Sequence, residues 1–196
     1  MIKFFTNREL SEKLNVNLAK WKRWSREFLP PDPLGGMQSG YARQYNPDEA
    51  FTVFLGGHLV ADLKFSIPEA KQMIKDLEKW LSDKGFFYDL KGNVAQKNGV
   101  DALVKSYEIL IQREKGPENH FKFLYTSRGI ISNEPSRHEG FDIMKKKYVE
   151  TSINWAHEEP SEVHMNVVKA LNISGVLSQF VDAVGLDRAH YPALSF

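Results

Sequence analysis

The stretch Val-Asn-Leu-Ala-Lys-Trp-Lys-Arg-Trp-Ser-Arg, residues 16–26, predicts a short helix with one apolar and one basic face. Side chains three or four positions apart share a face of a helix. On this spacing the apolar face holds Leu18, Trp21, Trp24, Ser25 and Phe28. The other face holds Lys20, Lys22, Arg23 and Arg26. A basic helix anchored on a small core is suited to a groove of DNA.

The segments around this helix predict a helix-turn-helix with further helices behind it. Thr6 and Glu9 form a capping box that starts a preceding helix, and Asn17 caps the basic helix after a short turn. Residues 46–49 and 66–69 carry the same kind of helix start, with a proline in the first turn. Between the basic helix and residue 46, Tyr41, Arg43 and Tyr45 alternate as in a short strand, which predicts a hairpin wing.

Six short motifs in this order resemble the DNA-binding domain of MerR-type transcription regulators. They are Phe5-Thr6-x-x-Glu9-Leu10, Val16-Asn17, Leu29-Pro30, Gly40-Tyr41-x-Arg43-x-Tyr45, Pro47-x-Glu49 and Phe65-Ser66-x-x-Glu69. The resemblance covers about residues 1–84 and implies a winged helix-turn-helix that binds double-stranded DNA as a homodimer. The chain departs from the family after residue 84, because Gly85, Gly92 and Gly99 interrupt the long helix through which family members pair.

The resemblance also implies roles for individual residues. Those expected to face the groove are Asn17, Ala19, Lys20, Lys22 and Arg23. The resemblance places Tyr41 and Arg43 on the DNA backbone, and we expect Arg26 of the basic helix to position the backbone with them. Lysine and arginine contacts to phosphate give affinity without sequence preference, whereas contacts to base edges give specificity.

The distribution of charge agrees with a DNA-binding module at the N-terminal end. The chain as a whole has a net charge of +1, but residues 1–46 carry eight cations and four anions. The remaining 150 residues carry 18 cations and 21 anions. No cysteine is present and no apolar run is long enough to span a membrane, so we expect a cytoplasmic protein that has no contact with the membrane.

The second half is predicted to mix strands with a long helix, and we recognise no family in it. Residues 100–107 have helical spacing, although Tyr107–Arg113 also reads as a strand. We favour a hairpin of residues 107–113 and 120–126 with a turn at 116–119, and a third strand over 148–155. A helical pattern then starts at Pro160 and ends at Gly185.

The predicted fold class is therefore mainly α with an α+β C-terminal region. We expect two domains: residues 1–84 form a MerR-like winged helix-turn-helix, and residues 85–196 form a hairpin-containing domain that ends in a long helix. The first domain would bind DNA in a sequence-specific transcription regulator. The second would serve dimerisation, sensing of a small-molecule effector, or both.

Two other functions stay open on the sequence: an architectural or excisionase-like DNA-binding accessory protein, and a protein-interaction module without DNA affinity. Several residues also fit a functional role as well as an ordinary structural one. His157 and His164 suggest a metal site, and Lys145–Lys147 a second nucleic-acid contact. Six aromatic residues suit either an aromatic ligand pocket or the core of the hairpin: Tyr107, Phe121, Phe123, Tyr125, Tyr148 and Trp155. No motif of an enzyme active site is present, so we expect neither catalysis nor a cofactor.

Overall fold

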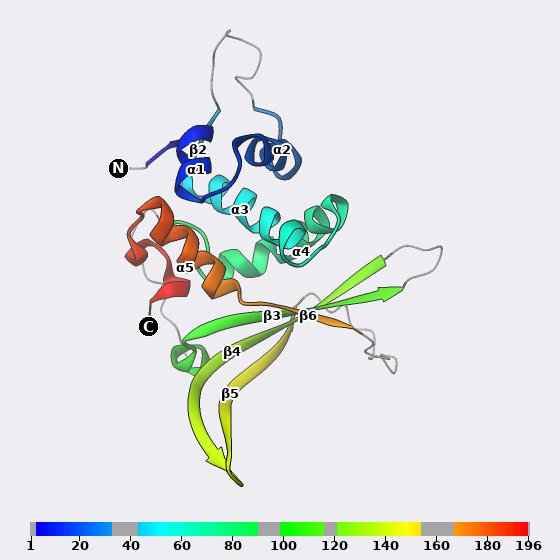
Figure 1. Ribbon diagram of the computed structural model, residues 1–196, viewed down its shortest axis with the longest axis vertical. Coiled ribbons are helices and arrows are strands. Elements are labelled where there is room, and N and C mark those ends of the chain that lie inside the picture. Colours follow the sequence, from blue (N-terminus) through cyan, green and yellow to red (C-terminus); the bar gives the residue numbers. More distant parts are fainter. Residues whose placement is uncertain (1–2, 33–42, 90–98, 116–120, 154–166, 196) are drawn as a thin grey trace. The chain divides into compact units, whose positions relative to one another are not determined.

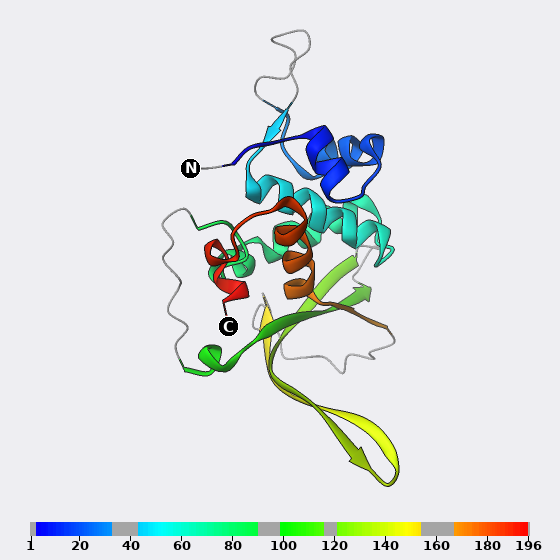
Figure 2. The ribbon, with the colours of Figure 1, turned by 60° about the vertical axis from the view of Figure 1, so that its left-hand side comes forward.

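The computed structural model describes residues 3–32, 43–89, 99–115, 121–153 and 167–195 (Figures 1 and 2). Of these residues, 47% are helical and 31% lie in strands, with five α-helices and a four-stranded antiparallel sheet. The chain is a mixed α+β protein, and the expectation of a mainly α fold was wrong. The error lies in the second half, where strands are longer than their sequence pattern suggested.

The chain divides into two compact units. The first comprises residues 1–94 and 176–192, and the second comprises residues 95–175 and 193–196. The first unit is therefore discontinuous in sequence, because residues 176–192 join residues 1–94.

The first unit begins with a two-stranded sheet and four helices. Its elements are β1 (Phe5–Thr6), α1 (Asn7–Lys13), α2 (Leu18–Phe28), β2 (Gln44–Tyr45), α3 (Pro47–Ala61) and α4 (Ile67–Asp83). The predicted caps are confirmed: Thr6, Asn46 and Ser66 each form a capping box with a glutamate three residues later, and Asn17 caps α2. These side chains bond the free amides of the first turn, which fixes where each helix starts.

Helix α2 lies close against α3 because α3 has two adjacent glycines at the crossing. The rings of Trp24 and Phe28 lie where a Cβ at Gly57 and Gly56, respectively, would stand. Trp21 and Trp24 are buried, as the apolar face of the basic helix predicted. The glycines thus let two large aromatic side chains of α2 pack directly on the backbone of α3.

The C-terminal helix α5 (Ile173–Val184) is shorter than expected. The sequence predicted one helical run from Pro160, but residues Val168–Leu171 form strand β6. Residues 154–166 lie outside the described part of the chain, and with them the start of that run, His157, His164 and Trp155. Phe180 of α5 is fully buried with its ring 5.5 Å from Phe51 and 5.8 Å from Phe54, both on α3.

After α5 the chain makes two short 3-10 helices, η3 (Arg188–His190) and η4 (Pro192–Leu194). The backbone amide of Asp89 donates to the carbonyl of His190 at 2.9 Å, and the rings of Tyr88 and His190 are 4.5 Å apart. The segment that follows α4 therefore runs beside the segment that follows α5, and both belong to the first unit.

The second unit is built on a sheet in the order β5-β4-β3-β6. Its elements are η1 (Gly99–Leu103), β3 (Ser106–Lys115), β4 (Phe121–His138), β5 (Phe141–Ile153) and β6. The predicted hairpin and third strand are confirmed, although β4 and β5 extend much further, to a turn at Glu139 and Gly140 where both residues have positive φ. The turn predicted at 116–119 lies outside the described residues.

Three of the aromatic residues that suited either a ligand pocket or a hairpin core lie on the buried face of the sheet. Tyr107, Phe123 and Tyr125 are buried with Ile109 and Ile111. Tyr148, by contrast, is exposed on β5. The side chain of Phe121 and the whole of Trp155 lie outside what the structure describes, so the buried trio supports the hairpin-core reading.

Candidate nucleic-acid interface

Helix α2 presents its predicted basic face to the outside of the first unit. Six residues of the predicted site lie on or just before this helix and are exposed: Asn17, Ala19, Lys20, Lys22, Arg23 and Arg26. The opposite face carries Trp21, Trp24 and Ser25, which are all buried. The amphipathic pattern therefore fixes which side of α2 is available to a partner.

The cations on this face differ in how they are held. The Nζ atom of Lys20 lies 4.7 Å from the centre of the Trp24 ring, a cation–π contact that orients the lysine along the helix. Lys22, Arg23 and Arg26 form no ion pair with any residue in the described part of the chain. Three cations without an internal counter-charge favour an anionic partner, since binding such a partner breaks no ion pair.

The side chain of Asn17 caps the first turn of α2. Its Oδ1 atom accepts from the amides of Ala19 and Lys20 at 2.9 and 3.2 Å. The carboxamide oxygen is thus occupied, and only the amide nitrogen is available for a contact to DNA.

The base of the expected wing is tied to the helix-turn-helix by Tyr45. Strand β2 pairs antiparallel with β1, so that Tyr45 lies opposite Phe5. The Tyr45 hydroxyl donates to Asn7 Oδ1 at 2.7 Å and lies 2.7 Å from Ser25 Oγ. Because a phenol has one proton, Ser25 is the donor in the second bond. One buried tyrosine therefore joins the wing strand, α1 and α2.

Arg43 is held at the same place by three contacts. Its guanidinium donates to the carbonyl of Pro30 at 2.9 Å, pairs with Glu49 at 3.4 Å and lies 5.5 Å from the centre of the Tyr45 ring. The side chain is only 15% exposed. Arg43 thus joins the end of α2 to the start of α3, and a phosphate contact there competes with Glu49. Tyr41 lies outside the described residues.

A cavity of about 510 Å³ opens between α2 and the base of the wing. Lys22, Arg26 and Arg43 contribute cations to its lining, and Asp32 contributes an anion. The hydroxyl of Tyr45 and Asn7 at the start of α1 add polar groups. The lining therefore brings Arg43 together with Lys22 and Arg26 of α2, and all three are members of the predicted site.

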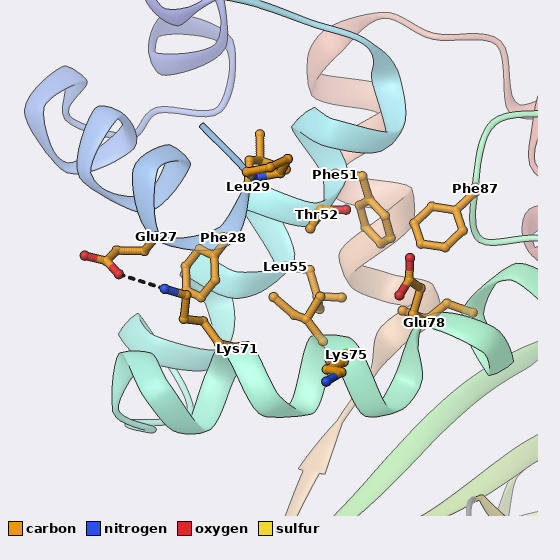
Figure 3. Close-up of a pocket in the computed structure, with 13 residues that line it drawn as sticks. Glu27, Phe28, Leu29, Phe51, Thr52, Leu55, Lys71, Lys75, Glu78 and Phe87 are labelled. Atoms are coloured by element: carbon orange, nitrogen blue, oxygen red, sulfur yellow. Dashed lines mark hydrogen bonds and ion pairs between the residues drawn. The ribbon is translucent and has the colours of Figure 1, made fainter. Parts of the chain in front are cut away.

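A second pocket of about 360 Å³ lies between the end of α2, α3 and α4 (Figure 3). Phe28, Phe51 and Leu55 supply apolar walls from α2 and α3. The ion pair of Glu27 and Lys71, at 3.2 Å, lies at one side and links α2 to α4 (Figure 3). Sequence reasoning missed this pocket, since each lining residue matches an ordinary core or surface position of its own helix.

Burial shifts the pKa of two groups near the interface. Desolvation raises the pKa of the Tyr45 hydroxyl, partly offset by its hydrogen bond to Ser25. It also raises the pKa of Asp48 at the start of α3, against the effect of the Tyr88 amide, which donates to its Oδ1 at 2.6 Å. Tyr45 is therefore neutral at physiological pH and acts as a hydrogen-bonding group.

Tyr45→Phe is expected to lower the free energy of unfolding by about 1–2 kcal/mol, because it leaves the buried hydroxyl of Ser25 without a partner. Urea unfolding of the full chain measures this change. Tyr148→Phe removes an exposed hydroxyl and serves as the control, with no expected change. Equal stability of Tyr45→Phe and the wild type would show that the Asn7–Tyr45–Ser25 connection contributes nothing.

Comparisons with known proteins give no relative from which function can be transferred. No protein-family model matches the chain, and no curated protein or solved structure matches it significantly. None of the described helices combines the length and apolar character needed to cross a membrane.

Proposed function

We propose that the chain is a dimeric, sequence-specific DNA-binding transcription regulator in which α2 enters the major groove. The observation that carries the proposal is the exposed basic face of α2, with Lys22, Arg23 and Arg26 unpaired within the described residues. Lys20 and Ala19 lie on the same face. In this proposal Lys20, Lys22 and Arg23 approach base edges, whereas Arg26, Tyr41 and Arg43 position the phosphate backbone.

The rigid support beneath α2 favours this proposal over a protein-interaction module. A recognition helix needs a fixed orientation, since base contacts depend on geometry. Here Trp24 packs on Gly57, Tyr45 bonds Ser25, and Glu27 pairs with Lys71. These three contacts join α2 to α3, to β2 and to α4.

The pocket beside Phe28 supports the sensing part of the proposal. Its volume of about 360 Å³ is within the range of small-molecule sites, and its walls are largely apolar. A small apolar effector bound there contacts the last turn of α2, so it has a direct way to alter the orientation of the recognition helix.

The double variant Lys22→Ala/Arg23→Ala tests the proposal. If both side chains contact base edges, affinity for the preferred duplex falls by at least tenfold, whereas the slope of log K against log salt, which phosphate contacts set, changes little. Fluorescence anisotropy with a labelled duplex, across salt concentrations, measures both quantities.

The matched control is Lys79→Ala/Lys105→Ala, which removes the same charge from two exposed lysines outside α2. We expect this variant to bind with nearly the wild-type affinity and slope. Equal losses in the two double variants would mean that only net charge matters, which contradicts a groove contact by α2.

A further inference from the structure

Strands β4 and β5 continue as a two-stranded ribbon beyond the end of β3. The first residue of β3, Ser106, lies opposite Ile130 of β4. From Ser132 to Lys147 the two strands pair only with each other among the described residues. We call residues 132–147 the β-arm, and Figures 1 and 2 show it leaving the rest of the sheet.

The β-arm exposes apolar side chains, and their contact with water is unfavourable in a monomer. Phe141 is 73% exposed and Met144 is 56% exposed, and Ile143 on the same strand is also exposed. Strand β5 is at the edge of the sheet, and no described strand pairs with its outer side. An edge of this kind offers a row of free backbone donors and acceptors to another strand.

We infer that the outer edge of β5 pairs antiparallel with the same edge of a second copy of this chain, with Met144 opposite Met144 at the two-fold axis. Two-fold symmetry keeps every side chain on its own face, so a residue pairs with one whose number has the same parity. This register places Asp142 opposite Lys146 of the second copy, twice by symmetry. Lys146 already pairs with Glu108 of its own chain at 3.2 Å, so in the dimer its ammonium lies near two carboxylates. The same register also places Lys145 and Lys147 opposite Ile143 and Phe141.

The charges select among the possible registers. Registers centred on Lys145, Lys146 or Lys147 put lysine opposite lysine, which destabilises a strand pair. A register centred on Tyr148 pairs Lys146 with Glu150, and both of these are already paired within the chain, with Glu108 and Arg128 respectively, whereas in the Met144-centred register only Lys146 is. Asp142 is 97% exposed and its contact with Arg137 is long, at 4.0 Å, so it is available to the second copy. The three lysines thus disfavour the registers centred on themselves and permit the Met144-centred one.

The inference deepens the proposed function, which requires a dimer, and supplies an interface in a chain whose glycines interrupt a long pairing helix. Its tests contain no DNA. A negative result for the β5 interface is therefore distinguishable from a negative result for DNA binding, because the two come from separate experiments.

Site-directed crosslinking tests the register, because the chain has no cysteine of its own. Met144→Cys in the full chain gives one thiol per subunit, and opposite residues of paired strands lie within the Cα separation that a disulfide spans. Under mild oxidation at micromolar concentration, we expect most of Met144→Cys to run as a covalent dimer on a non-reducing gel. Thr151→Cys, exposed on the same strand, is expected to stay uncrosslinked.

Two results would overturn the inference: a wild-type chain that is monomeric by light scattering at this concentration, or a Met144→Cys variant that crosslinks no more than Thr151→Cys. Preferential crosslinking of Tyr148→Cys would equally contradict the Met144-centred register. A monomer that uses Lys145–Lys147 to contact nucleic acid would give the first of these results.

A charge variant tests the interface without crosslinking. Met144→Glu places two carboxylates against each other at the axis, so the dimer dissociation constant is expected to rise at least tenfold in sedimentation equilibrium. Met144→Gln has a similar length and no charge, and we expect it to remain dimeric. Because residue 144 is exposed, both variants are expected to keep the wild-type circular dichroism; an unchanged constant in a folded Met144→Glu variant contradicts the proposal.

Discussion

Phe180→Ala is expected to lower the free energy of unfolding of the first unit by about 3–5 kcal/mol. The Phe180 ring is fully buried against Phe51 and Phe54 of α3, although these residues are more than a hundred positions away in sequence. Its removal leaves a cavity in the core that supports the helix-turn-helix. Thermal or urea unfolding, followed by circular dichroism, measures the loss.

Gln179→Ala is the control for this prediction, because Gln179 is the exposed neighbour of Phe180 on the same helix. We expect it to change stability by less than about 0.5 kcal/mol. A loss for Phe180→Ala as small as that of the control would mean that α5 does not belong to the core of the first unit. The prediction thus tests whether the C-terminal helix stabilises the first unit.

Gly57→Val is expected to destabilise the first unit by about 3 kcal/mol and to weaken DNA binding at least tenfold. A Cβ at this position overlaps the six-membered ring of Trp24, which is itself buried. The ring cannot move without displacing α2 from α3, so the recognition helix changes orientation. Unfolding measurements and duplex binding, made at a temperature where the variant is folded, separate the two effects.

Gly56→Val provides a matched comparison on the adjacent residue of α3. A Cβ there approaches the ring of Phe28 to 2.6 Å, but Phe28 is the partly exposed last residue of α2 and can rotate outward. We expect a smaller loss, about 1 kcal/mol. If both variants lose the same amount, the clash with Trp24 is not the cause.

Local signals in the sequence predicted the helices of the first unit. Capping boxes at Thr6, Asn46 and Ser66 act within one turn, so their effect is visible without knowing the rest of the fold. The pairing of β1 with β2 was not predictable in this way. Two-residue strands carry no periodicity, and Phe5 and Tyr45 pair although they are far apart in the sequence.

The second half shows how tertiary contacts override a local pattern. Val167 and Leu171 have helical spacing with the residues of α5, yet Leu171 lies in β6 opposite Ile109 of β3. The β-arm was missed for the opposite reason: its residues alternate without a buried face, so no hydrophobic period marks them. The exposed residues of the candidate DNA interface were predictable because amphipathic spacing on α2 fixes its outer face.

Selection of bound sequences from a random pool of duplex DNA, repeated at several salt concentrations, tests the central claim most directly. The account predicts an enriched inverted repeat, as a two-fold dimer requires, and affinity that falls steeply with salt. Retention without any sequence preference would instead indicate an architectural DNA-binding protein. The absence of retention even at low salt would contradict DNA binding by α2.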